Sequence, residues 1–150
     1  PSVKLRAQDM EQTRRSCQVY RDNPVTIVTF PEGTRFRPAK HERQGAPYAH
    51  LLRPLAGGMA FSLAAMEGRL QQMLDVTLYY PDGVPSFMDY ASGRVRRVHV
   101  HVVQHTLGED LVGDYQNDQQ FRVYFQRWLN QLWKEKDARL EQLRQRSANP

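Results

Sequence analysis

The sequence predicts an α/β layer fold, in which helices alternate with short strands, and three observations support this prediction. A β-branched apolar run at 25–30 follows closely on a helical pattern at 9–21. A helix-period stripe of methionines and leucines at 58–73 leads directly into a second apolar run at 75–81. Valines and histidines then alternate around residue 100, and such alternation is typical of a strand.

The first two elements are a helix over 9–21 and a strand over 25–30. Asp9 is suited to cap the start of the helix, and Asn23-Pro24 ends it because the residue before a proline disfavours the helical conformation. The strand, VTIVTF, is β-branched and mostly apolar, which is typical of a strand inside a sheet. We therefore expect this strand to be buried.

The middle of the chain predicts a loop, a helix and a second strand. Residues 38–55 contain three prolines and one glycine, so we expect a long irregular connection there. The helix over 58–73 should pack one face into the core, and the second strand over 75–81 should end at Pro81. The core face of that helix carries Met59, Leu63, Met66, Leu70 and Met73.

The last third predicts a loop at 84–93, a strand at 95–105 and a long helix over 118–146. Val98, Val100 and Val102 lie on one face of the strand, opposite the face of His99 and His101. One stripe of the helix consists of Phe121, Phe125, Trp128 and Leu132. From Lys134 onward the helix is strongly charged, so we expect solvent around it.

Charge indicates the chemistry of the partner. The net charge of +5 and the pI of about 9.6 favour an anionic partner, which leaves phosphate, nucleic acid and acidic lipid open. Basic residues cluster at 35–43 and at 94–97. Cys17 lies in a polar helical pattern without an evident partner, so it is not expected to act as a nucleophile. No apolar run approaches the roughly 20 residues that a membrane helix needs.

The stretch FPEGTR, which directly follows the first strand, carries the residues best suited to bind a ligand. Gly33 allows the backbone to turn and a ligand to approach, and Thr34 offers a hydroxyl. Arg35 offers a planar group that can contact two phosphate oxygens. Glu32 is suited either to anchor Arg35 or to accept a hydrogen bond from a ligand hydroxyl. Ligands of open α/β sheets gather at the carboxyl ends of strands, although a surface turn with an incidental Glu–Arg pair has the same composition.

FPEGTR resembles a conserved block of the glycerolipid acyltransferases, the 1-acylglycerol-3-phosphate acyltransferase family. The flanking sequences are similar to the subgroup of lysocardiolipin-type and bacterial inner-membrane enzymes; they read VTIVTFPEGTRFRPAKHERQGAPYAHLLRPLAGGMAFSLAAM and LDVTLYYPDG. The resemblance covers residues 1–135, which it implies are the C-terminal part of a layered α/β acyltransferase domain. Residues 136–150 would then be a charged helical tail.

The resemblance implies transfer of an acyl group from acyl-CoA or acyl carrier protein to a lysophospholipid such as lysophosphatidate, in phospholipid biosynthesis or remodelling. Its conserved block implies that Glu32, Gly33, Thr34 and Arg35 bind the acceptor's phosphate. The family also implies that the protein contacts an anionic membrane surface. This contact would be at the cytoplasmic face of the membrane, which in bacteria is the inner membrane. We expect no cofactor besides the thioester donor and no metal ion at His99 and His101. We also expect no nucleic-acid partner, because only the net charge favours one.

The resemblance leaves the catalytic residues unassigned. In the family, a histidine followed five residues later by an aspartate precedes the Pro-Glu-Gly-Thr-Arg block, and no histidine precedes Pro31 here. The resemblance therefore implies that the fold lacks its N-terminal part, and we expect the 150-residue chain to be inactive alone. His105 and Asp110 match the spacing but follow the block, and we interpret them as a strand-exit loop. The alternative function is a non-catalytic module that binds anionic lipid or glycerol phosphate.

Overall fold

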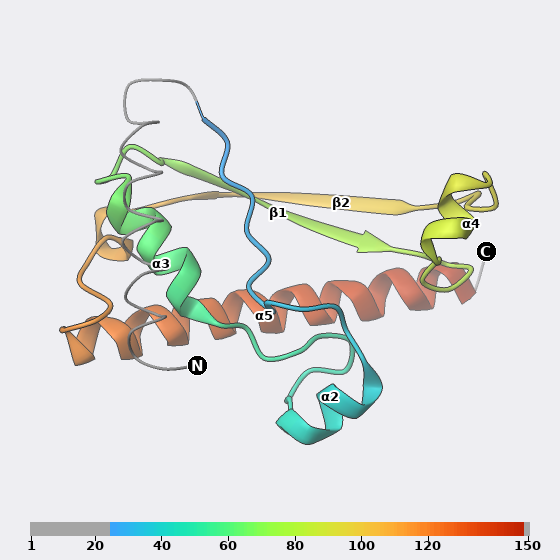
Figure 1. Cartoon of the computed structure of the whole chain (residues 1–150), viewed down its shortest axis with the longest axis horizontal. Helices are drawn as coiled ribbons and strands as arrows, with labels where there is room; N and C mark the ends of the chain where they lie inside the picture. Colours follow the sequence, from blue (N-terminus) through green and yellow to red (C-terminus); the bar gives the residue numbers. More distant parts are fainter. Residues whose placement is uncertain (1–24, 149–150) are drawn as a thin grey trace.

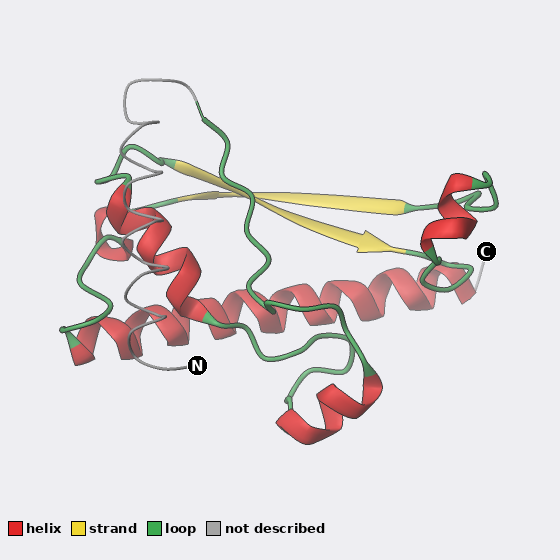
Figure 2. Ribbon diagram, viewed as in Figure 1, coloured by secondary structure: helices red, strands yellow, loops and turns green. Residues whose placement is uncertain are grey.

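The structure is a computed structural model that describes residues 25–148, and within that range the fold is mixed α/β. It contains four α-helices, one short 3-10 turn and one two-stranded sheet (Figures 1 and 2). In chain order the elements are α2 (Pro38–Gln44), α3 (Ala56–Ala65), β1 (Gln72–Tyr79), α4 (Phe87–Ala91), β2 (His99–Thr106), a 3-10 turn (Glu109–Leu111) and α5 (Gln119–Ala148). The helix expected over 9–21, with Cys17, lies outside the described residues.

The sheet is an antiparallel hairpin of β1 and β2. The two strands pair along their whole length, from Gln72 opposite Thr106 to Tyr79 opposite His99. One face carries buried Asp75 and Thr77 and lies against α5. The other face is apolar and largely open, with exposed fractions between 47% and 61% for Leu74, Val76, Leu78, Val100 and Val102.

The core forms where α3 and the first half of α5 pack together. α5 is 30 residues long, which corresponds to about 45 Å, and it runs beneath the sheet (Figure 1). Asp118 starts it, because its Oδ1 accepts hydrogen bonds from the backbone N–H groups of Gln120 and Phe121. The buried cluster consists of Tyr48, Ala56, Met59, Ala60, Leu63, Leu111, Phe125, Leu129, Leu132 and Trp133.

The methionine stripe packs as predicted, but its helix is shorter. Met59, Leu63 and Met66 are buried, while Leu70 and Met73 are partly buried against the core. α3 ends at Ala65 rather than near residue 73. The next residues turn the chain, since Glu67 and Gly68 have φ angles of 49° and 76° in the left-handed region.

The buried strand expected over 25–30 is absent, and this prediction was wrong. The segment belongs to no sheet, and Val28 and Phe30 are 72% and 81% exposed. A strand needs a neighbour for its backbone N–H and C=O groups, and the described sheet is limited to β1 and β2. The prediction rested on β-propensity, which does not indicate whether a neighbouring strand is present.

Two expected loops contain short helices. α2 lies within the connection expected over 38–55; it starts with Pro38 in the first turn and ends at Gly45, whose φ is 52°. α4 lies within the loop expected over 84–93, and a capping box between Ser86 and Asp89 starts it. Within the described residues, every helix is too short or too polar to cross a bilayer.

Candidate functional site

Residues 31–35, here called the motif loop, form a tight turn that is tied to the start of α3. The Gly33 N–H donates to the Phe30 carbonyl at 2.8 Å, and Gly33 has a φ of 65°. A side chain at this position would strain the backbone, so the turn favours glycine. The Leu55 N–H donates to the Pro31 carbonyl at 2.7 Å, which holds the loop beside the residue that precedes α3.

Glu32 anchors the motif loop to two other parts of the fold. Its Oε1 accepts hydrogen bonds from the Leu52 N–H at 3.1 Å and from the Trp133 Nε1–H at 3.4 Å. Burial raises the pKa of the Glu32 carboxyl, and the hydrogen bonds from Leu52 and Trp133 oppose this rise. The Glu32–Arg35 pair considered from the sequence is not formed, because the Glu32 carboxylate points toward α5 instead.

Thr34 and Arg35 lie on the surface of the motif loop. Both side chains are exposed, and neither makes a hydrogen bond or an ion pair with another described residue. Arg37 and Arg43 are exposed as well, whereas Lys40 is half-buried and its charge lowers the pKa of Glu32. The loop therefore holds its carboxylate inside and presents its hydroxyl and guanidinium outside.

The first turn of α3 adds positive potential beside the motif loop. The helix has no side-chain cap and no acidic residue in its first turn. Gly57 and Gly58 follow directly on Ala56, and a Cβ at Gly58 would meet nothing within 4 Å. Free N–H groups and the helix dipole both favour an anion at such an end.

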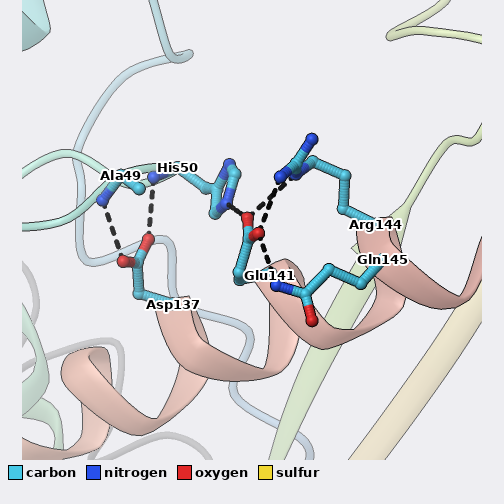
Figure 3. A network of polar contacts seen from close by, with 6 residues as sticks. All are labelled: Ala49, His50, Asp137, Glu141, Arg144 and Gln145. Atoms are coloured by element: carbon cyan, nitrogen blue, oxygen red, sulfur yellow. Dashed lines mark hydrogen bonds and ion pairs between the residues drawn. The ribbon is translucent and has the colours of Figure 1, made fainter. Parts of the chain in front are cut away.

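The second half of α5 fixes the segment that carries Leu52 (Figure 3). The Asp137 carboxylate accepts hydrogen bonds from the backbone N–H of Ala49 at 2.8 Å and of His50 at 2.7 Å. The His50 ring contacts Glu141 at 2.9 Å between Nε2 and Oε2. The charged part of α5 was expected to be solvated; Lys134 and Glu135 are exposed, but Asp137 and Glu141 contact residues 49 and 50 instead.

Glu141 is the centre of this network. It accepts hydrogen bonds from Arg144 Nη2 at 2.7 Å and from Gln145 Nε2 at 2.8 Å. The Arg144 guanidinium holds the pKa of the Glu141 carboxyl well below its usual range, and Gln145 and His50 add to the effect. The sequence predicted that the acyltransferase domain ends at residue 135 and that a charged tail follows. α5 runs through this position without a break, and the domain boundary stays a prediction.

A buried charge cluster joins α5 to β1. Asp75, 7% exposed, contacts Lys136 Nζ at 2.5 Å and Arg139 Nη1 at 3.0 Å. Lys136 also donates to the Val76 carbonyl at 2.7 Å. The Lys136 charge also slightly lowers the pKa of Glu32, against the rise that burial causes.

Neither His41 nor His105 is bonded to a carboxylate within the described region. No hydrogen bond joins His105 to Asp110: the Asp110 carboxylate accepts from the Tyr124 hydroxyl, and the buried His105 Nε2 has no partner among the described residues. His41 Nε2 contacts the Tyr48 carbonyl at 2.6 Å. Within residues 25–148 no three potential ligands from His, Cys, Asp and Glu are arranged to hold a metal ion.

Sequence reasoning missed the residues of α5 that support the motif loop. Asp137 and Glu141 lie in the part of the helix expected to be solvated, and the hydrogen bond from the buried Trp133 to Glu32 was not predicted. Their spacing offered a signal, because Phe125, Leu129, Trp133, Asp137 and Glu141 recur every four residues along one side of the helix. The buried stripe thus continues in polar residues, which indicates a polar partner rather than solvent.

The chain is similar to one curated protein from fission yeast. No protein-family model and no solved structure matches the chain. The chain is 26% identical, over 140 residues, to a Schizosaccharomyces pombe protein named as an uncharacterized acyltransferase. The match covers 79% of this chain and 37% of the yeast protein, so the chain spans little more than a third of that relative's length.

Proposed function

We propose that this chain forms the acceptor-binding part of an acyltransferase, in which Gly33, Thr34 and Arg35 receive the phosphate of the acceptor. The observation that carries the proposal is the exposed Arg35, which has no partner among the described residues and lies on a loop fixed by α5. The similarity to the yeast acyltransferase supports acyl transfer as the reaction class. The acceptor is a lysophospholipid such as lysophosphatidate, and the donor is acyl-CoA or acyl carrier protein.

The direction of the two charged side chains supports a phosphate ligand. A carboxylate that faced the ligand would repel phosphate, but Glu32 is bonded to Leu52 and Trp133 on the inner side. Arg35 is left on the outer side as a two-point donor. Glu32 then acts as a positioning residue, and Arg35 as the binding residue.

Proton transfer is not assigned to this chain. The acceptor hydroxyl needs a general base before it can attack a thioester carbonyl. The histidines nearest in sequence to the motif loop, His41 and His50, are bonded to the Tyr48 carbonyl and to Glu141. The described site thus also fits the alternative, a module that binds glycerol phosphate or anionic lipid without catalysis. We further propose that the chain works at the cytoplasmic face of a membrane, where its acceptor lies.

Binding of glycerol 3-phosphate, followed by calorimetry on the 150-residue chain, tests the proposal. Arg35→Lys keeps the charge and loses the planar contact, so the affinity should fall roughly 10- to 150-fold, as expected for one lost charged hydrogen bond. Arg35→Ala should weaken binding further. Arg127→Ala, an exposed arginine on α5, is the matched control and should change nothing. Equal binding of glycerol and glycerol 3-phosphate, or unchanged affinity of folded Arg35→Ala, would contradict the proposal.

A further inference from the structure

The connection between β1 and β2, residues 80–98, is here called the hairpin tip. It lies beyond the end of β1, at the opposite end of the hairpin from α3 (Figure 1). Four of its large apolar side chains are strongly exposed: Val84 by 88%, Phe87 by 80%, Met88 by 64% and Tyr90 by 72%. Four large apolar side chains that are exposed within seven positions of the chain make this segment a candidate for an interaction site.

Hydrogen bonds fix the backbone of the hairpin tip, so the exposed side chains are attached to an ordered turn. Ser86 and Asp89 form a capping box, in which the Asp89 N–H donates to Ser86 Oγ at 3.2 Å and the Ser86 N–H donates to Asp89 Oδ2 at 3.0 Å. The Arg94 N–H donates to the Asp89 carbonyl at 2.9 Å and closes the end of the helix. The apolar residues of α4 thus stand outward from a fixed turn.

Three arginines lie beside the exposed apolar side chains. Arg94 pairs with Asp89 at 3.1 Å, and Arg97 pairs with Asp82 at 2.9 Å. Arg96 is exposed and makes no hydrogen bond or ion pair with another described residue. All three line a hollow of about 330 Å³, which also includes Tyr80 and Pro85.

We propose that the hairpin tip docks on an anionic membrane surface. Phe87, Met88 and Tyr90 would enter the boundary between headgroups and acyl chains, and Arg96 would contact a lipid phosphate. Aromatic and apolar side chains beside arginine are typical of segments that lie in the membrane interface. The inference rests on the proposed location of the chain at a membrane, and it goes beyond acceptor binding because this surface is separate from the motif loop.

The charge of the hairpin tip favours a membrane over a nucleic acid. Its three arginines face two aspartates, Asp82 and Asp89, so most of the positive charge is already paired. Nucleic-acid binding depends on several free cations that neutralise phosphates along the backbone. One unpaired arginine among four exposed apolar side chains instead matches a bilayer, which offers hydrocarbon and phosphate together.

Co-sedimentation of the 150-residue chain with lipid vesicles tests the inference. The chain should bind vesicles of phosphatidylcholine with phosphatidylglycerol more tightly than vesicles of phosphatidylcholine alone, and salt should weaken the difference. Arg96→Gln should weaken partitioning onto anionic vesicles about fivefold. The double variant Phe87→Ser and Met88→Ser should weaken it by about tenfold or more.

Matched controls separate the hairpin tip from the rest of the surface. Val123→Ser and Arg127→Gln change an apolar and a basic side chain exposed on α5, and both should partition like the unchanged chain. All replaced side chains are exposed, so circular dichroism should show an unchanged fold. Arg96→Gln should also keep its affinity for glycerol 3-phosphate, whereas Arg35→Ala should lose it, so the two proposals fail separately.

Three results would overturn the inference. The first is equal partitioning of the double variant and the unchanged chain. The second is equal binding to vesicles with and without the anionic lipid. The third is failure to bind any vesicle while a single-stranded RNA probe binds through the tip residues, which would assign the surface to a nucleic acid.

Discussion

The Trp133 indole donates a hydrogen bond to the Glu32 carboxylate at 3.4 Å, across 101 positions of the chain. The contact makes α5 part of the candidate site, although α5 holds none of the residues proposed to bind the ligand. A helix fixes its side chains more firmly than a surface turn does, so Glu32 takes its orientation from the core. The predictions that concern the motif loop therefore depend on α5.

Glu32→Gln should leave the fold as stable as before, or more stable, at pH 7. Burial raises the pKa of the Glu32 carboxyl, so its ionised form costs stability above the folded pKa. That cost is relieved as the pH falls through the folded pKa toward the unfolded value of about 4.5. Gln keeps an acceptor for Leu52 and Trp133 without the charge. Thermal unfolding from pH 8 to pH 4 should show the two proteins converging at acid pH, and a variant less stable at pH 7 would contradict the reasoning.

Glu141→Gln should have the opposite pH dependence. The pKa of Glu141 is lowered chiefly by Arg144, so its contribution to stability is present above the unfolded value of about 4.5 and is lost as the pH falls through the folded pKa. The variant should melt at a lower temperature at pH 7, and the difference should shrink in acid. Glu135→Gln, whose carboxylate accepts only from Gln131 in the described region, is the control and should have a small effect at every pH.

Asp75→Ala should destabilise the fold strongly. It would leave Lys136 and Arg139, whose side chains are 13% and 15% exposed, without their counter-charge. Removal of one member of a buried ion pair costs about 3–5 kcal/mol. Asp82→Ala breaks the exposed pair with Arg97 and should cost less than about 1 kcal/mol. Urea unfolding measures both, and equal losses would show that burial of the cluster is unimportant.

The open face of the hairpin should make the isolated chain self-associate. Leu74, Val100 and their neighbours expose apolar side chains on a sheet whose two edges are unpaired by described residues. Sedimentation velocity should show mass rising with concentration. Val100→Lys should reduce this association, while Val123→Lys on α5 should not. A monomer at every concentration would refute the prediction.

The 150-residue chain alone should not transfer acyl groups. No histidine precedes the Glu-Gly-Thr-Arg block in the sequence, and the Nε2 atoms of His41 and His50 are already bonded to the Tyr48 carbonyl and to Glu141. Incubation with acyl-CoA and lysophosphatidate should release no more free thiol than a denatured control. Release that depends on lysophosphatidate would show that another residue acts as the base.

Local patterns predicted the elements whose partners are close in sequence or strongly periodic. The alternation of valines predicted β2, and the apolar stripe through Phe125 predicted α5, because burial of one face imposes its period on the sequence. The strand at 25–30 failed because strand formation depends on a neighbour that propensity does not reveal. α2 and α4 were missed because helices of one or two turns leave too few residues to show a period.

The candidate site was predictable in its residue types but not in their directions. The composition of FPEGTR indicated a turn that presents an arginine, and the structure contains that turn with Arg35 exposed, while phosphate binding by Arg35 stays a prediction. Which way Glu32 points depends on Trp133, and no local pattern encodes a contact over that separation. Long-range hydrogen bonds of this kind are decided by packing, which sequence spacing records only indirectly.

The long separation between Glu32 and Trp133 also imposes an order on synthesis. The ribosome releases the motif loop well before α5, and at roughly 5–20 residues per second the 101 intervening positions take about 5–20 s to make. During that interval the nascent chain exposes the Glu32 carboxylate without its indole donor. If the motif loop binds phosphate as proposed, its full anchoring is completed late in translation, and a message cut short before the codon for Trp133 would yield a motif loop without its indole anchor.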